Sequence, residues 1–424
     1  MSSKRFRRLA LPLAVLPLLG ALPAQGQEAK RRWDQMCQIR KDKLDLILPE
    51  AMRENRIDMW IVASREGHDD PNAALLGGGY VGDVGYHVFA DRTGSGRIER
   101  TAMGIGGAAF DQCPLYDQKL SPAELRRFVE ARDPKRIGID VATEIGTADG
   151  LSHSLHAKLV SDFRSRHSAG EIAAFARAGE YSRTILERAL SNEVIVPGHT
   201  TTGDVAWWMM ERLHDEGLGN SFGLPSIYIL GPGERGPVSG DHVIQPGDLI
   251  TVDWGVNYLF YYTDMKRMAY VLRPGENAPP AGVQRAYDKA QDIRRMILDV
   301  IRPGVTAGDA LAAVNKRVAE TPGLVLGRYD DPSKDLKVSD VVIGSHSVGD
   351  WGHGSGPSIA DFNPLRMTYQ LRASNFLSIE LFLYTQVPEW GMRKIKIPLE
   401  DNGVVTERGF EWAYPPNSRI LLVK

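Results

Sequence analysis

Four carboxylates and one histidine in the second half of the chain have the residue types of a divalent-metal site. In chain order they are Asp253, Asp264, His346, Glu380 and Glu400. Oxygen ligands with one imidazole suit Mn²⁺, and Zn²⁺ or Co²⁺ also bind such sets. Any one of these acids alone is more typical of a solvated strand residue. The four negative charges together match two divalent ions, so the ordered set predicts a dinuclear metal site.

The spacing of the first two acids predicts a hairpin that brings them together. Residues 249–272 are rich in β-branched and aromatic residues and are interrupted near Asn257-Tyr258. This composition is typical of two strands joined by a turn. In a simple antiparallel pair with its turn there, Asp253 and Asp264 lie directly opposite one another on one face, with Cβ atoms about 5 Å apart.

The last two acids predict a second hairpin of the same kind. Residues 376–385 and 393–400 form the expected strands, and Trp390 marks the centre of the turn, so Glu380 and Glu400 also face each other. Facing carboxylates repel one another unless a shared proton, a basic partner or a metal ion neutralises them. Metal ions are the interpretation we favour, because they account for both hairpins.

The two hairpins belong to a weak internal repeat. Residues 194–204 and 300–309 each run from an apolar segment through Pro-Gly to a threonine and an aspartate. Threonine is a preferred helix N-cap, and aspartate is favourable in the first helical turn. Two unrelated loop-to-helix junctions are the alternative, since Pro-Gly is common. Because one acidic hairpin follows each copy, we favour a duplication.

The 424 residues are enough for two domains. Helical and strand-like stretches alternate over residues 31–159 and predict a smaller α/β domain without a catalytic constellation. Ser168, followed three residues later by Glu171, predicts a helix start with a capping box. We therefore expect an α+β fold. A small N-terminal α/β domain would span residues 27–165, and a duplicated catalytic domain with a curved antiparallel sheet and external helices would span residues 166–424.

The first 26 residues have the order of a secretory signal peptide. Four cations precede an apolar run over residues 9–22, and the small residues Ala24 and Gly26 follow at positions −3 and −1. A membrane anchor is the alternative, but the run contains two prolines and is shorter than the roughly 20 residues that span a bilayer. We expect cleavage after Gly26, export to a periplasm or the outside, and no stable membrane insertion afterwards.

Composition narrows the possible partners. The formal net charge is −2 and no basic tract occurs outside the leader, so a nucleic-acid partner is not expected. The hydrophobic fraction of 43% and the charged fraction of 25% are typical of a soluble globular protein.

The two cysteines, Cys37 and Cys113, would be able to pair in an oxidising compartment, but two cysteines do not define a disulfide framework. Their pairing stays open.

The ordered motifs resemble those of the pita-bread metallopeptidases, which include aminopeptidase P, prolidase, methionine aminopeptidase and the related creatinase. The resemblance is strong over residues 171–423 and looser before them. Five segments carry it, and each surrounds one residue that corresponds to a metal ligand of the family: two aspartates, one histidine and two glutamates. In chain order the segments are residues 247–255, 263–267, 345–349, 378–380 and 399–402. The N-terminal α/β domain is also a feature of prolidase-type members.

The resemblance implies a role for each ligand. Asp264 and Glu400 would bridge both ions. Asp253 would complete one coordination shell, and His346 with Glu380 would complete the other. Creatinase hydrolyses a non-peptide C–N bond on this fold without the metal ligands. Because all five ligands are retained here, the resemblance favours the metal-dependent branch with two divalent ions, Mn²⁺ before Zn²⁺ or Co²⁺.

The same resemblance implies the reaction. Glu380 would take a proton from the attacking water and pass it to the leaving amine, and His353 would help to hold the substrate carbonyl. A packed or loop histidine is the alternative for His353. The expected reaction removes the N-terminal residue from Xaa-Pro peptides, and family members often form homodimers. The alternatives are hydrolysis of another amide or C–N bond, and a catalytically impaired metal-binding or scaffold protein.

Three positions depart from the family's pattern, and all concern substrate binding. Gly236 stands where the family usually has a substrate-binding histidine, and the residue after His353 is Gly354 instead of an acid. Pro398 stands where prolidase-type members commonly carry arginine. Lys396 shares the strand face of the last glutamate and would supply the positive charge, without the fork geometry of arginine. The expected metal shell is intact, and the substrate shell is thinner.

Overall fold

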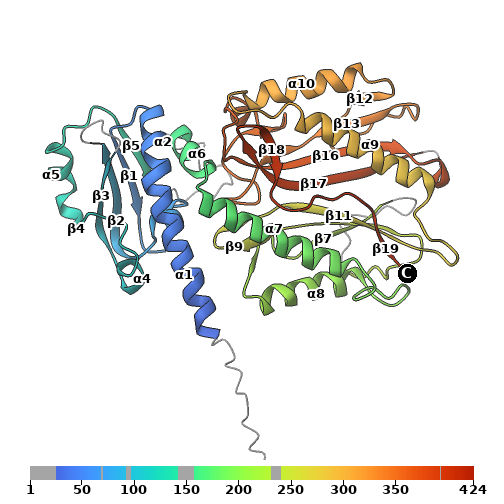
Figure 1. The fold of residues 1–424 in the computed structure, drawn as a ribbon, viewed down its shortest axis with the longest axis horizontal. Coiled ribbons are helices and arrows are strands. Elements are labelled where there is room, and N and C mark those ends of the chain that lie inside the picture. Colours follow the sequence, from blue (N-terminus) through green and yellow to red (C-terminus); the bar gives the residue numbers. More distant parts are fainter. Residues whose placement is uncertain (1–24, 68–69, 92–96, 142–156, 231–239, 392) are drawn as a thin grey trace, which may run out of the picture.

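The computed structural model describes residues 25–67, 70–91, 97–141, 157–230, 240–391 and 393–424. The predicted leader, apart from its last two residues, lies outside these ranges, and so does Gly236. Figure 1 shows a small sheet in the N-terminal part of the chain and a large sheet in the C-terminal part. No helix within the described ranges combines the length and the apolar character needed to cross a membrane.

The N-terminal sheet has five strands in the order β4-β3-β2-β1-β5. They are β1 (Met59–Ser64), β2 (Tyr80–Asp91), β3 (Ile98–Gly106), β4 (Gln118–Leu120) and β5 (Ile137–Val141). The pairs β1·β5 and β3·β4 are parallel, and the other two pairs are antiparallel. This mixed sheet confirms the predicted α/β character of the N-terminal part.

Helices accompany this sheet and lead to the larger part. A π-helical turn, η1, joins the first two helices and ends just before Pro49, whose missing amide cannot serve an α-helix interior. Cys37 of α1 forms a disulfide with Cys113, so the pairing that the sequence left open is present. The elements are α1 (Gln25–Asp42), η1 (Lys43–Ile47), α2 (Leu48–Glu54), α3 (Ala73–Leu76), α4 (Ala108–Asp111), η2 (Pro122–Glu124), α5 (Leu125–Glu130) and α6 (Ala157–Ser165).

The large sheet has the central strand order β12-β13-β16-β17-β11-β8-β7. These strands are β7 (Ser226–Leu230), β8 (Leu249–Trp254), β11 (Met265–Val271), β12 (Leu324–Leu326), β13 (Ser339–Ile343), β16 (Phe376–Gln386) and β17 (Lys394–Thr406). Four shorter strands pair with this sheet outside its central order: β14 (Ser345–Ser347), β15 (Ser358–Ile359), β18 (Gly409–Trp412) and β19 (Leu421–Val423). A separate three-stranded sheet contains β6 (Gly219–Asn220), β9 (Val256–Tyr258) and β10 (Tyr261–Tyr262).

Four long helices belong to the large sheet, and their starts follow the predicted capping signals. They are α7 (Ala169–Ala189), α8 (Thr202–Asp215), α9 (Ala281–Leu298) and α10 (Ala307–Glu320), with the short α11 (Pro364–Met367) and η3 (Pro388–Trp390). Ser168 and Glu171 form the predicted capping box at α7. The threonine N-caps expected in both copies of the repeat are present at α8 and α10, where each accepts a hydrogen bond from the backbone of the aspartate.

The sheet order reflects the predicted duplication. The hairpin β8–β11 and the hairpin β16–β17 meet where β11 pairs with β17, in the middle of the sheet. Helices α9 and α10 share one apolar core with β16 and β17, while α7 and α8 share another with β8 and β11. On β16, Ile379 and Leu381 point into the helical core, so the alternating Glu380 faces the opposite side. The acids therefore lie on the face that these helices leave uncovered.

Candidate metal centre

The first acidic hairpin forms, but its register differs from the prediction. Lys266 of β11 is paired with Asp253 of β8, and the turn lies at Leu259 and Phe260. Both turn residues have positive φ, 53° and 64°, as a two-residue hairpin turn requires, although neither is a glycine or asparagine. The prediction that Asp264 lies directly opposite Asp253 is therefore wrong. Because the slip involves two residues, Asp264 still faces the same side of the sheet.

The second acidic hairpin has the predicted register. Glu380 of β16 is paired directly with Glu400 of β17, and Trp390 lies in the connecting η3 turn. On its other side, Glu400 is paired with Lys266 of β11. One row of opposed residues thus runs across four neighbouring strands, in the order Asp253, Lys266, Glu400 and Glu380.

A second row lies two residues further along the same strands. Asp264 precedes β11, and its backbone amide donates to Asn402 Oδ1 at 3.0 Å. Asn402 is paired with Ser378, and Ser378 is paired with His346 of β14. Ser378 Oγ also donates to Glu400 Oε1 at 2.6 Å, which links the two rows. All five predicted ligands are therefore gathered in one patch of the sheet.

Lys266 occupies the middle of the first row, a position that was not predicted from the sequence. Its Nζ lies 2.6 Å from Glu380 Oε1 and 3.1 Å from Asp253 Oδ2, and it also contacts Glu400 Oε2. The residue is 7% exposed. The sequence did contain a signal for this position. Lys266 follows Asp264 by two residues, and on a strand that spacing places both side chains on one face. A basic partner, one of the three ways to neutralise facing carboxylates, is thus present.

The opposite end of the cluster centres on His346. Its Nδ1 lies 2.9 Å from the carbonyl oxygen of Ser347, so Nδ1 carries the hydrogen and Nε2 presents its lone pair to the site. Three carboxylate oxygens face Nε2, namely Glu400 Oε1 at 3.4 Å, Asp264 Oδ2 at 3.8 Å and Glu380 Oε2 at 3.9 Å.

Two buried atoms at this end lack hydrogen-bond partners within the described part of the chain, His346 Nε2 and Asp264 Oδ1. Buried polar atoms are rarely left unpaired. A nitrogen that faces three carboxylates needs a proton or a metal ion between them, and Glu400 and Glu380 raise the pKa of His346 accordingly. A carbonyl-oriented imidazole is also the usual arrangement of a histidine ligand. Residues at this end therefore fit a divalent ion. At the other end, the Lys266 ammonium already engages the carboxylates.

His353 lies beside this end of the cluster. Its Nε2 is 3.4 Å from Asp264 Oδ2, and its ring is edge-on to that of His346 with centroids 4.6 Å apart. The side chain is 70% exposed, in contrast to the buried acids. Partial loss of hydration beside the cluster, followed by the charge of His346, lowers the pKa of His353 to about 4 although much of its side chain reaches solvent. The histidine expected to contact substrate is therefore at the site, neutral and accessible.

Burial and mutual charge interactions shift the pKa values of the carboxyl groups in the cluster. Burial, followed by the charge of Glu400, raises the pKa of Asp264 well above its usual range. The same two causes raise the pKa of Glu380 to about 7. Burial also raises the pKa of Glu400, but Lys266 and His346 together outweigh it and hold this pKa below the ordinary value. Glu400 is thus kept as a carboxylate, whereas Asp264 and Glu380 need a further cation to lose their protons readily.

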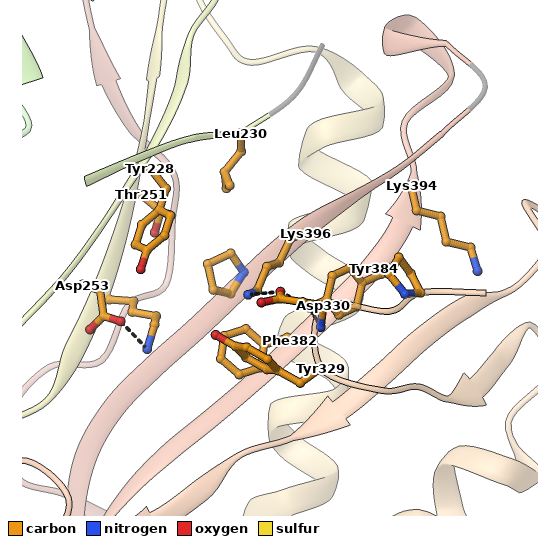
Figure 2. Close-up of a pocket in the computed structure, with 13 residues that line it drawn as sticks. Tyr228, Leu230, Thr251, Asp253, Tyr329, Asp330, Phe382, Tyr384, Lys394 and Lys396 are labelled. Carbon is orange, nitrogen blue, oxygen red and sulfur yellow. Dashed lines mark hydrogen bonds and ion pairs between the residues drawn. The ribbon is translucent and has the colours of Figure 1, made fainter. Parts of the chain in front are cut away.

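A pocket of about 600 Å³ opens next to Asp253 and Lys266. Figure 2 shows aromatic side chains around it, with Lys396 and Asp330 joined by an ion pair of 2.9 Å. The Lys396 ammonium also lies 4.2 Å from the ring centre of Tyr329. As predicted, Lys396 lies on the site face of β17, but it is paired with Asp330 across the pocket. The aromatic residues of the lining are Tyr228, Tyr329, Phe382 and Tyr384.

Fold and site together define a metallopeptidase of the pita-bread class. Residues 173–407, more than half of the chain, match the model of metallopeptidase family M24, and the chain belongs to this family. It is 26% identical over 326 residues to the uncharacterized peptidase YqhT of Bacillus subtilis, which covers 76% of this chain and 74% of that protein. It is 33% identical over 155 residues to the probable dipeptidase PepE of Mycobacterium tuberculosis, which covers 35% of this chain and 38% of that protein.

Solved structures share the whole architecture. The X-Pro aminopeptidase of Thermotoga maritima has a TM-score of 0.62 at 18% identity, and the match covers 88% of this chain and 100% of that one. The prolidase of Pyrococcus horikoshii has a TM-score of 0.56 at 19% identity, with 90% and 100% covered. At such identities the likeness establishes the fold. The predicted fold class and family are thereby confirmed, and the family implies a divalent metal and a peptide substrate.

Proposed function

We propose that this chain is a metal-dependent hydrolase that removes the N-terminal residue from Xaa-Pro peptides, in the manner of aminopeptidase P or prolidase. The observation that carries the proposal is the unpaired, buried His346 Nε2, which faces oxygens of Asp264, Glu380 and Glu400. Membership of a metallopeptidase family supports peptide hydrolysis. The X-Pro aminopeptidase and prolidase among the structural neighbours support the Xaa-Pro substrate by analogy.

These residues would hold a divalent ion through one imidazole nitrogen and carboxylate oxygens, a donor set that suits Mn²⁺ first and Zn²⁺ or Co²⁺ next. The sequence predicts a second ion held by Asp253, Asp264 and Glu400, whose ligand atoms also converge, but Lys266 Nζ already contacts two of these three carboxylates. A bound divalent ion would supply Lewis-acid activation of water and polarisation of the scissile carbonyl.

The protein's own groups would move the proton and hold the substrate. Lys266 fixes Glu380 Oε1, while Glu380 Oε2 faces the His346 end of the cluster. From there Glu380 would accept a proton from the attacking water and deliver it to the leaving proline nitrogen. His353 would donate to the substrate carbonyl oxygen, which its exposed side chain is free to reach.

The neighbouring pocket supplies space for a substrate side chain. Its aromatic lining offers apolar contact to a proline ring or another apolar group. Lys396 and Lys266 also line the pocket, but each is paired with acidic residues of the protein. A small peptide with an apolar residue beside the scissile bond therefore suits the pocket.

Hydrolysis of another amide or C–N bond is the second candidate, and Lys266 is the observation that favours it. An ammonium among the carboxylates changes the charge that a substrate meets, and so would change which substrates bind well. The substrate histidine expected at Gly236 is also absent from the sequence.

We further propose that the mature chain is exported after loss of its leader. The disulfide between Cys37 and Cys113 supports this localisation, because disulfides persist chiefly in oxidising compartments. Cell fractionation of the full-length chain, with N-terminal sequencing of the product, tests the proposal. A cytosolic chain that keeps its first 26 residues would contradict it.

The test of the proposed activity is release of the N-terminal residue from an Xaa-Pro peptide by the mature protein. It is run with and without added Mn²⁺ and after chelation, with the matching Xaa-Ala peptide as control. We expect metal-dependent release from the Xaa-Pro peptide only. Bound metal without release would favour the second candidate, whereas neither metal nor turnover would favour a scaffold protein with vestigial metal chemistry.

A further inference from the structure

The position of Lys266 divides the acidic cluster into two ends. Strand pairing on both sides fixes its backbone, with Asp253 of β8 on one side and Glu400 of β17 on the other. Its ammonium contacts both of these carboxylates and Glu380. Two of the three, Asp253 and Glu400, belong with Asp264 to one of the groups of side chains able to hold a cation. The lysine nitrogen is therefore bound to ligands of one expected metal position.

We propose that the Lys266 ammonium replaces one of the two metal ions, so that the site binds a single divalent ion at the His346 end. The inference rests on the proposed metal-dependent function, but it concerns the number and place of the ions and not the substrate.

The two glutamates show how the ammonium and one ion share the cluster. Glu400 contacts Lys266 through Oε2 and faces His346 Nε2 through Oε1. Glu380 contacts Lys266 through Oε1 and faces the same nitrogen through Oε2. Each glutamate thus points one oxygen at the ammonium and the other at the His346 end. The two carboxylates bridge two positive centres, of which one is the lysine.

Charge and burial oppose a second ion at the Asp253 end. Four carboxylates balance two divalent ions only if no other cation is present, and the Lys266 ammonium adds a positive charge inside the cluster. A divalent ion between the same carboxylates would repel this buried ammonium strongly, because few water molecules screen the pair. Moving the lysine away would break three charge-assisted contacts and leave a buried charge unpaired. The ammonium and a second ion therefore exclude each other.

The His346 end has no such competitor. His346 Nε2 and Asp264 Oδ1 have no hydrogen-bond partner among the described residues. The nearest cationic side chain of this cluster, Lys266, is engaged at the other end. A single ion there would face His346 Nε2 and the carboxylate oxygens that lie within 3.9 Å of it, which belong to Asp264, Glu380 and Glu400.

The experiment counts metal ions per chain in the mature protein, without substrate. Wild type, Lys266→Met and Lys396→Met are saturated with Mn²⁺, freed of excess ions by gel filtration and analysed by plasma mass spectrometry. Methionine keeps the length of the lysine stem without its charge, and Lys396 is the matched control because it lines the pocket but contacts none of the predicted ligands. We expect one ion per chain in wild type and Lys396→Met, and two in Lys266→Met.

Electron paramagnetic resonance of the wild type keeps the inference testable if Lys266→Met does not fold. A spectrum of isolated Mn²⁺ is expected, and an exchange-coupled Mn²⁺ pair would overturn the inference. Two ions or none in the wild type would overturn it as well, and so would a folded Lys266→Met protein that still binds one. A wild type with one ion that leaves Xaa-Pro peptides intact would refute the proposed activity alone.

Discussion

Lys266 Nζ lies 2.6 Å from Glu380 Oε1, although the two residues are 114 positions apart in the chain. Lys266 belongs to the hairpin of the first half of the catalytic sheet, and Glu380 to the hairpin of the second half. Their contact therefore joins the two copies of the repeat at the point where the candidate metal ligands meet. A buried ammonium at this junction distinguishes the site from one that is neutralised by metal ions alone.

Replacement of Glu380 by alanine is expected to abolish hydrolysis and to leave a folded protein. The change removes a proposed ion ligand that is also the proposed proton carrier, and proton transfer alone contributes about 100-fold or more to such reactions. Lys266 retains Asp253 and Glu400 as partners, so its charge stays compensated. Turnover of an Xaa-Pro peptide and circular dichroism measure the two outcomes. The exposed Glu407→Ala is the control, and full activity of Glu380→Ala would refute the proposed mechanism.

His353→Ala is expected to reduce kcat/KM by about 100-fold while the metal content stays unchanged. Loss of one donor to the developing oxyanion typically has an effect of this size. His353 is also close enough to Asp264 and His346 to serve as a ligand, so metal analysis separates the two roles. A parallel loss of metal and activity would reassign His353 as a ligand instead of a substrate-binding residue.

Removal of the disulfide is expected to lower stability without changing catalysis. Cys37 and Cys113 lie 76 residues apart, and both belong to the N-terminal part of the fold, away from the metal cluster. Loss of a native disulfide typically costs about 2–4 kcal/mol of unfolding free energy. Urea denaturation of the Cys37→Ser/Cys113→Ser protein measures this loss, and reduced wild type is the matched control. Unchanged stability of both would show that the bridge does not stabilise the fold.

The buried His87 is expected to make stability depend on pH. Burial lowers the pKa of His87 to about 3, from 6.5. The unfolded chain therefore takes up a proton between these values and the folded chain does not, so stability is lost as pH falls below about 6.5.

From pH 7 to pH 5 this one histidine is expected to remove about 2 kcal/mol of unfolding free energy. His87 Nδ1 lies 2.5 Å from Tyr116 Oη, and Tyr116 Oη donates to the Leu76 carbonyl, so glutamine is a suitable replacement that retains a donor but does not titrate. Urea denaturation at both pH values compares wild type with His87→Gln. Equal losses in the two proteins would contradict the assignment.

Local sequence signals predicted one hairpin correctly and the other incorrectly, for a physical reason. The Pro388-Glu389-Trp390-Gly391 segment contains turn-forming residues, and the register that it predicts places Glu380 opposite Glu400, as observed. The first hairpin turns at Leu259 and Phe260, which have positive φ although leucine and phenylalanine rarely adopt it, so the residue types do not mark the turn.

The role of Lys266 was missed for a related reason. The wrong register placed it opposite Thr251, two residues from Asp253, although it lies directly opposite Asp253. Its second neighbour, Glu400, stands 134 positions away and is reached only through the pairing of β11 with β17. Residue types and order therefore sufficed to predict the family and the five candidate ligands that the structure gathers, while the cation among them depended on contacts between distant strands.

Diffraction from crystals saturated with Mn²⁺, recorded near the manganese absorption edge, tests the central claim most directly. We expect one anomalous peak, within bonding distance of His346 Nε2 and of oxygens of Asp264, Glu380 and Glu400, with Lys266 Nζ still beside Asp253. Two peaks with Lys266 displaced from the cluster would show an ordinary dinuclear centre. No peak at the cluster would contradict both the metal-dependent function and the single-ion site.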